Sequence, residues 1–403
     1  MKNLVARIQE RARDYEGAMV SFLRELIAIP SESCQEGKVV ERIRQEMERV
    51  GFDEVKIDPM GNILGRIGSG PRVIAMDAHV DTVGIGDPEE WELDPYKGKL
   101  EDGIIHGRGA TDQTGAMASM VYAARIIKDL DLANDFTLYM VGSVQEEDCD
   151  GLCWQYIIRE VGLKPELVVI TEPTNLNIYR GHRGRMEIRV TTRGISCHGS
   201  APERGENAVT KMAPIIAGID ELNGRLKDDP FLGKGTICVS YIECDTPSLC
   251  AVPDRCEIHL DRRLTFGEDK ELALAQVREV CQAAGVEAEV RMHMYDTPSY
   301  TGLVYPTEKY FPTWVLPEEH VGVRSAVETY TQLFQTPPKV DKWTFSTNGV
   351  SIMGLHGIPC VGFGPANEIY AHSVKDQVPV EHLVKAAQFY TLFPLVYCQM
   401  AGQ

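Results

Sequence analysis

The sequence predicts an α/β fold in which an α/β/α domain with a mostly parallel sheet is interrupted by a smaller, ferredoxin-like βαββαβ domain. Three observations support this prediction. Helical and extended segments alternate in the first third of the chain, the middle changes to a βαββαβ order, and the last third returns to the first pattern. A chain of 403 residues is also long enough for two or three domains at about 150 residues each.

The first third alternates between two kinds of periodicity. Apolar residues at helical spacing predict helices over 19–28, 39–50 and 112–130, and Pro30 and Gly51 end the first two. Mostly apolar runs predict buried strands over 72–78, 136–144 and 167–171, with a further helix over 153–161. Strands that are separated by helices favour a largely parallel sheet.

The middle of the chain contains a complete set of elements for a second domain. We predict strands over 185–192, 236–243, 255–264 and 288–294, and helices over 207–226 and 270–284. The last third then predicts helices over 323–334, 346–356 and 379–398, with a buried strand over 358–362. The expected organisation is therefore one discontinuous domain, residues 1–182 and 296–403, with a second domain inserted at 183–295.

The composition excludes several classes of protein. There are 41 Lys and Arg against 59 Asp and Glu, a formal charge of −18, which argues against nucleic-acid partners and against anionic membrane surfaces. We find no apolar run near the ~20 residues that a membrane span requires, and the charged N-terminus does not resemble a signal peptide. The 11 Cys are scattered without a CxxC pair, so we expect a cytoplasmic protein.

Histidines and carboxylates of the predicted main domain lie beyond strand ends. The positions are His79, Asp81, Glu146, Glu147, Glu172 and His372, and Asp112 lies at a helix start after a glycine-containing turn. Ligands in open α/β sheets bind beyond the carboxyl ends of the strands. Taken singly, each residue also fits an ordinary role, such as a helix cap or an acidic loop. Their shared position is what indicates a site.

The residue types suit a pair of metal ions. Two histidines and three carboxylates can hold two divalent ions, with one carboxylate shared between them. Nitrogen and oxygen donors favour zinc, with cobalt or manganese as alternatives. One glutamate is left over, and a hydrolase needs such a group as a general base.

The motifs AHVDTV, GRGATDQTG, the Glu–Glu pair, TEPT, HGSAP and the late AHS together resemble the M20 family of metallohydrolases. This family includes acetylornithine deacetylase, succinyl-diaminopimelate desuccinylase and carboxypeptidase G2. The resemblance covers nearly the whole chain and is greatest to the selenium-metabolism-linked hydrolase subgroup. It implies a catalytic main domain and an inserted domain that serves for dimerisation and as a lid.

The resemblance also implies a role for each residue of the site. It implies His79 as a ligand of one metal and His372 as a ligand of the other, with Asp112 bridging them. Glu147 and Glu172 resemble the terminal ligands, one on each metal. Asp81 resembles the carboxylate that orients His79, and Glu146 resembles the general base.

Three residues of the inserted domain resemble family positions that contact the substrate. His198 resembles the histidine that reaches into the partner's site of a homodimer and stabilises an oxyanion. Arg263 and Asn207 match positions that contact a substrate carboxylate or carbonyl. Arg262 is the alternative to Arg263, since successive strand residues face opposite ways and only one of the two can face the site. These two arginines, with Arg183 and Arg185, could form a local cationic pocket.

Two departures from the family pattern weaken any transfer of a substrate from a named enzyme. Thr114 stands where the family often has lysine, and the segment TNGVS lacks a common aspartate. Neither position is a ligand. We interpret Cys149 and Cys197, which lie near site residues, as inert thiols.

We therefore expect a dizinc hydrolase that cleaves an amide bond of a small, carboxylate-bearing substrate with metal-activated water, as an N-acyl amino acid deacylase does. The alternatives are a dipeptidase, aminopeptidase or carboxypeptidase on short peptides, and a carbamoyl-amide hydrolase of nitrogen or purine catabolism. A nucleotide-binding role for GRGATDQTG is disfavoured, because the full GxGxxG spacing is missing. A non-catalytic metal-binding or ligand-binding module is disfavoured because Glu146 is present.

Overall fold

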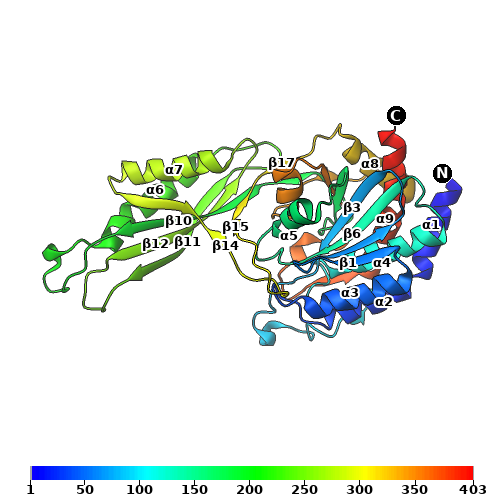
Figure 1. Cartoon of the computed structure of the whole chain (residues 1–403), viewed down its shortest axis with the longest axis horizontal. Helices are drawn as coiled ribbons and strands as arrows, with labels where there is room; N and C mark the ends of the chain where they lie inside the picture. Colours follow the sequence, from blue (N-terminus) through cyan, green and yellow to red (C-terminus); the bar gives the residue numbers. More distant parts are fainter. Residues whose placement is uncertain (1, 403) are drawn as a thin grey trace.

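The computed structural model describes residues 2–402 and separates the middle of the chain from its two ends. Figure 1 shows an elongated molecule in which both termini lie in the larger part and the chain segments around residues 190–290 form the other end. Residues 2–402 form two hydrophobic cores, one in each part. These separate cores support a division near residues 183–295, although the boundaries themselves stay a prediction.

The larger part is built on an eight-stranded sheet. Its order is β1-β2-β6-β3-β7-β19-β8-β18. The strands are β1 (Glu54–Ile57), β2 (Ile63–Ile67), β3 (Arg72–His79), β6 (Phe136–Ser143), β7 (Leu167–Ile170), β8 (Ile178–Tyr179), β18 (Val340–Asp341) and β19 (Cys360–Gly362). β3 pairs parallel with β6 and β7, and β7 pairs parallel with β19, so the centre is parallel as predicted. The pairs β1–β2, β2–β6 and β8–β19 are antiparallel.

Helices cover this sheet. They are α1 (Lys2–Asp14), α2 (Glu16–Ile27), α3 (Gly37–Val50), α4 (Thr114–Asp129), α5 (Leu152–Tyr156), α8 (Val321–Phe334) and α9 (Val380–Ala401). α4 packs against β3 and β6 and is itself covered by α9, which explains why almost every residue of α4 is buried. Asn348 donates a hydrogen bond to Asp77 of β3 and accepts one from Cys153 of α5, which ties α5 to the sheet. None of the described helices combines the length and the apolarity needed to cross a bilayer.

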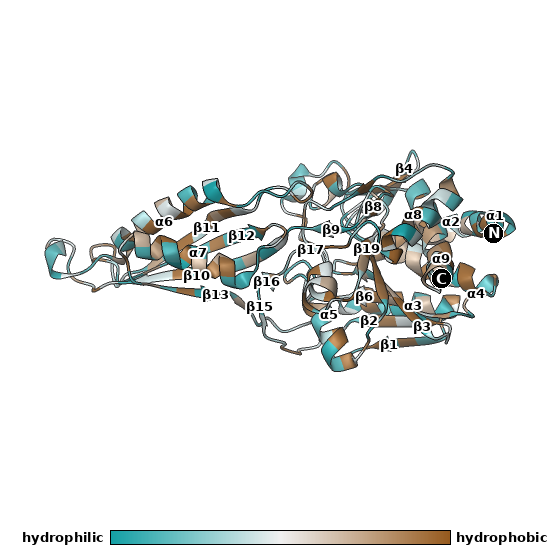
Figure 2. Cartoon of the chain, turned by 90° about the horizontal axis from the view of Figure 1, so that it is seen from above, coloured by the Kyte–Doolittle hydropathy of each residue, from teal (hydrophilic) through white to brown (hydrophobic). Residues whose placement is uncertain are grey.

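The smaller part has the predicted βαββαβ order. It consists of β10 (Gly184–Arg193), α6 (Ala208–Arg225), β11 (Thr236–Asp245), β12 (Arg255–Leu264), α7 (Lys270–Ala283) and β13 (Ala288–Met292). The antiparallel order β11-β12-β10-β13 is extended by β16 (Tyr310–Phe311), which pairs with β10. Figure 2 shows α6 and α7 striped with hydrophobic and hydrophilic residues, as expected of helices that cover one face of a sheet.

Short paired segments connect the two parts. β9 (Gly181–His182) precedes β10 and pairs with β17 (Trp314–Val315) on the returning chain. β14 (Met294–Tyr295) pairs with β15 (Thr307–Glu308). A small separate sheet of β4 (Lys99–Glu101), β5 (Ile104–His106) and β20 (Gln377–Pro379) lies in the larger part.

Several local expectations differ from the structure. The segments predicted as helices over 153–161 and 346–356 end in, or reduce to, π-helical turns, η2 (Ile157–Val161) and η4 (Val350–Leu355). Strands β1 and β2 had no sequence prediction, since they are only four and five residues long. The final helix continues to Ala401 despite Pro394 in its interior.

Candidate metal centre

The predicted ligands come together at one edge of the main sheet. His79 ends β3, and Glu147 and Glu172 follow β6 and β7. Asp112 lies just before α4, and His372 lies in the loop after β19. The strands are parallel here, so their carboxyl ends meet at the same edge.

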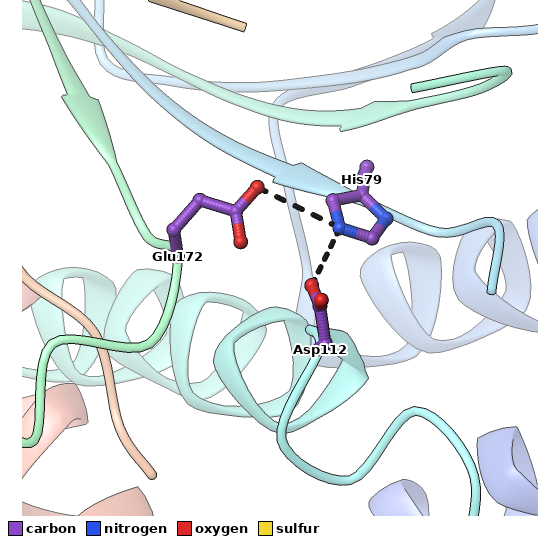
Figure 3. A group of neighbouring side chains, drawn as sticks. All are labelled: His79, Asp112 and Glu172. Carbon is purple, nitrogen blue, oxygen red and sulfur yellow. Dashed lines mark hydrogen bonds and ion pairs between the residues drawn. The ribbon is translucent and has the colours of Figure 1, made fainter. Parts of the chain in front are cut away.

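One group of possible ligands is formed by His79, Asp112 and Glu172, all buried (Figure 3). The Nε2 atom of His79 lies 2.8 Å from Asp112 Oδ1 and 3.6 Å from Glu172 Oε1. The second ring nitrogen, Nδ1, lies 2.8 Å from the backbone carbonyl of Asp81. A hydrogen bond at that carbonyl leaves Nε2 free to bind a cation.

The second group shares Asp112. His372 Nε2 lies 2.9 Å from Glu147 Oε2 and 3.4 Å from Asp112 Oδ2. The two oxygens of Asp112 therefore lie close to two different histidines. This is the arrangement that a bridging carboxylate requires. His372 is the exposed member of the set, with 52% of its side chain accessible.

The donor set fits two divalent cations. Burial and the Asp112 carboxylate raise the pKa of Glu172, whose Oε2 has no hydrogen-bond partner in the described part of the chain. Burial lowers the pKa of His79, but Glu172 and Asp112 more than compensate and raise it well above its ordinary value. Hydrogen bonds to Asp112 and Glu147 raise the pKa of His372 to about 10. The close carboxylates favour a positively charged partner, and divalent cations would supply that charge.

The Asp81 carboxylate was expected to orient the His79 ring, but its closest contacts are elsewhere. This carboxylate is 3.6 Å from His79 Nδ1, whereas the backbone carbonyl of Asp81 makes the close contact. The carboxylate instead accepts hydrogen bonds from the backbone N–H groups of Glu146 and Glu147, at 3.2 and 3.0 Å. It also accepts one from the Ser33 hydroxyl at 2.7 Å. Asp81 therefore holds the turn that carries both glutamates.

Glu146 has the properties expected of a proton carrier. Burial raises its pKa well above the ordinary value, and the nearby Asp150 carboxylate adds to this against the opposing effect of His79. Its Oε1 has no hydrogen-bond partner among residues 2–402. A carboxyl group with an unoccupied oxygen and a raised pKa can take up and release a proton.

These side chains surround a cavity of about 370 Å³. Its lining residues are His79, Asp112, Glu146, Glu147, Asp150, Glu172, Arg185, Arg263, Phe345, Ser346, Glu368, Ala371 and His372. Arg263 lines it, whereas Arg262 is buried elsewhere in an ion pair with Glu268. The sequence left open which of the two arginines faces the site, and the cavity lining favours Arg263. Arg183 is absent from the lining and Arg185 is present.

His198 and Asn207 do not reach this cavity within one chain. His198 is exposed, and its Nδ1 lies 2.7 Å from the Ser200 hydroxyl. The Asn207 side chain caps α6 by accepting hydrogen bonds from Val209 and Thr210. Both residues belong to the inserted part, and neither is among the residues that line the cavity.

Three charged or polar neighbours had no assigned role from the sequence. Asp150 and Glu368 line the cavity, and so does Ser346. Asp150 belongs to an acidic segment of the sequence that begins at Glu146. The sequence does not show which carboxylate of such a segment lines a cavity. Cys149, by contrast, is buried and its thiol pKa is raised by burial, which agrees with an inert role.

The chain belongs to the family described as Peptidase family M20/M25/M40, whose model matches residues 75–395. It is thus a metal-dependent hydrolase of amide bonds. The chain is 58% identical to an uncharacterized Escherichia coli K12 protein, YgeY, over 96% of each chain. It is 25% identical to a succinyl-diaminopimelate desuccinylase of Magnetococcus marinus, covering 92% of this chain and 96% of the relative.

Solved structures share the fold. A dinuclear metal-binding M20 peptidase from Bacillus subtilis matches with a TM-score of 0.71 at 15% identity, over 96% of this chain and 99% of the other. The aminopeptidase PepT from Bacillus cereus matches with a TM-score of 0.71 at 20% identity, over 96% and 99%. The α/β fold and the M20 resemblance predicted from the sequence are confirmed.

Proposed function

We propose that this protein is a dizinc amide hydrolase of the N-acyl amino acid deacylase type, acting on a small substrate that carries a carboxylate. The observation that carries the proposal is the position of Asp112, whose two oxygens lie 2.8 Å from His79 Nε2 and 3.4 Å from His372 Nε2. A carboxylate shared by two histidine-containing groups, beside an unused buried glutamate, is suited to two-metal hydrolysis.

In this proposal His79, Asp112 and Glu172 hold one ion, and Asp112, Glu147 and His372 hold the other. Zinc is our choice for a set of imidazole and carboxylate donors, with cobalt or manganese as alternatives. Bound divalent ions polarise the amide carbonyl and lower the pKa of water.

The protein's own groups carry the proton and hold the substrate. Glu146 takes a proton from the attacking water on its free Oε1 and passes it to the leaving nitrogen. Arg263 binds the substrate carboxylate. Its Nε and Nη2 atoms donate to Asp261, at 2.7 and 3.0 Å, which fixes the plane of the guanidinium and leaves Nη1 for the substrate.

The proposal includes a homodimer formed through residues 183–295. The exposed position of His198 supports this, since within one chain it lies outside the cavity lining. In the dimer His198 stabilises the oxyanion in the partner's site, and Asn207 contacts the substrate. A cytoplasmic location belongs to the same proposal and is supported by the eleven free cysteines.

The test is an amine-release assay on zinc-loaded protein with matched N-acyl amino acids and dipeptides. We expect turnover of the acyl compounds. Glu146→Ala should abolish it while two metals per chain remain bound, and Glu10→Gln, at an exposed glutamate of α1, should have no effect. Turnover of dipeptides alone would replace the deacylase proposal with a peptidase. Near-normal activity of Glu146→Ala would refute the general base.

A further inference from the structure

We propose that Asp150 is a specificity-determining residue, whose carboxylate binds a protonated amino group of the substrate inside the cavity. This inference rests on the proposed function, because it places the amino group on the molecule whose amide bond is cleaved. It narrows the substrate class to amides that carry a basic nitrogen in addition to the carboxylate.

Asp150 is a buried carboxylate with an unused oxygen. Only 6% of its side chain is accessible, and it lines the same cavity as the two metal-ligand groups. Its Oδ2 has no hydrogen-bond partner in the part of the chain that the structure describes. Burying a charged oxygen without a partner is costly, so such an atom indicates a ligand that supplies the missing donor.

Arg185 does not satisfy this carboxylate. Its Nη2 lies 3.3 Å from Asp150 Oδ1, longer than the roughly 2.8 Å of a good charge-assisted hydrogen bond. The same Nη2 atom also lies 3.4 Å from Glu187, so one nitrogen serves two carboxylates. The guanidinium is held over the Phe311 ring at 4.8 Å, which fixes its position. Asp150 thus keeps one oxygen without a described hydrogen-bond partner, in a residue that lines the cavity.

Asp150 is not one of the candidate metal ligands. It belongs to neither of the two histidine-containing groups. On β10 and β12, Arg185 and Arg263 stand directly opposite each other, and both line the cavity. A substrate carboxylate at Arg263 would therefore lie near Arg185 and its partner Asp150. A molecule with both a carboxylate and an ammonium group has charges complementary to Arg263 and Asp150, respectively.

Glu368 is the competing acceptor. It also lines the cavity, and its buried Oε2 atom has no hydrogen-bond partner among the described residues. It lies on the short helical turn η5 (Glu368–Tyr370), is only half-buried, and its other oxygen lies 3.3 Å from the Thr344 hydroxyl. The more completely enclosed Asp150 is therefore our assignment, and Glu368→Gln serves as the matched comparison.

The test is calorimetric binding to the zinc-loaded protein with product-like probes. The probes are 2,4-diaminobutyrate, ornithine and lysine, each compared with its uncharged counterpart, 2-aminobutyrate, norvaline and norleucine. We expect at least one diamino acid to bind about tenfold more tightly than its counterpart, or better, since a charge-assisted hydrogen bond has this effect. Asp150→Asn should remove the preference, because its amide presents an N–H group, and Asp150→Glu and Glu368→Gln should retain it.

Several results would overturn the assignment. They are equal binding within every pair, no binding of any probe, a preference that survives in Asp150→Asn, or a preference that disappears in Glu368→Gln. Melting temperatures of the variants show whether each is folded. Hydrolysis of N-acetylated forms, measured separately, distinguishes the two proposals. Selective binding without hydrolysis would refute the proposed function alone, and hydrolysis without selectivity would refute Asp150 alone.

Discussion

Acidification should destabilise the protein through His182, at the connection between its two parts. His182 is fully buried on β9. Its Nδ1 lies 2.8 Å from the carbonyl of Arg183, and its Nε2 accepts hydrogen bonds from Trp314 Nε1 at 2.7 Å and from the Thr347 backbone at 3.1 Å. Because Nε2 is an acceptor, the ring is neutral in the folded protein. Burial accordingly lowers the pKa of His182 to about 4.

The size of the effect follows from this shift. Between pH 6.5 and pH 4 the unfolded chain binds a proton at His182 and the folded chain does not, so acid favours unfolding. A difference of about 2.5 pKa units at ~1.4 kcal/mol each corresponds to about 3 kcal/mol. This contribution is fully present above pH 6.5 and is lost as the pH falls to 4.

The assay is urea unfolding of chelator-treated protein, followed by tryptophan fluorescence at intervals between pH 4 and 7.5. Trp314 and Trp343 report locally, since their rings lie 5.3 and 6.2 Å from the His182 ring. His182→Asn should be less stable than the wild type at pH 7, and this gap should narrow by about 3 kcal/mol on acidification. A gap that stays constant with pH would show that His182 is not held neutral, and the reasoning would fail.

Four further outcomes are expected. Asp81→Asn should lower hydrolysis about 10- to 100-fold by loosening the turn that carries Glu146, with metal content measured alongside; unchanged turnover would exclude this positioning role. Gly364→Ala should cost about 1–3 kcal/mol in urea unfolding, because its Cβ would stand 2.1 Å from the Glu172 carbonyl; an unaltered midpoint would contradict this clash. A chelator should lower the melting temperature and added zinc should restore it, unless no metal binds the folded state. Mixed dimers of inactive His198→Ala and Glu146→Ala chains should regain activity, which dimers of either variant alone should lack.

The main outline of the fold was predictable because it rests on local periodicity. Helices α2, α3, α8 and α9 and strands β3, β6 and β7 lie within a few residues of their predicted ranges. The βαββαβ order of the inserted part was predictable for the same reason. Short strands such as β1 and β2 were not, because four or five residues carry too little periodicity to distinguish a strand from a loop.

For the site, too, some features were predictable from the local sequence and others were not. The strand-end positions of His79 and Glu172 were readable, since apolar runs mark where a buried strand ends. The sequence did not show that the Asp81 carboxylate binds the Glu146–Glu147 backbone more closely than it binds the His79 ring. That contact depends on the conformation of a turn 65 residues away along the chain.

The sequence by itself thus determined the α/β class, the inserted domain and the family, because periodicity and ordered motifs are local properties of the chain. Only the tertiary structure decided that Arg263 rather than Arg262 lines the cavity, and that Asp150 lies there with an oxygen unsatisfied. The physical reason is that the direction and burial of a side chain depend on which distant segments pack against it. Arg262 is held in a buried ion pair with Glu268, and Asp150, in the turn before α5, lies 3.3 Å from Arg185 of β10.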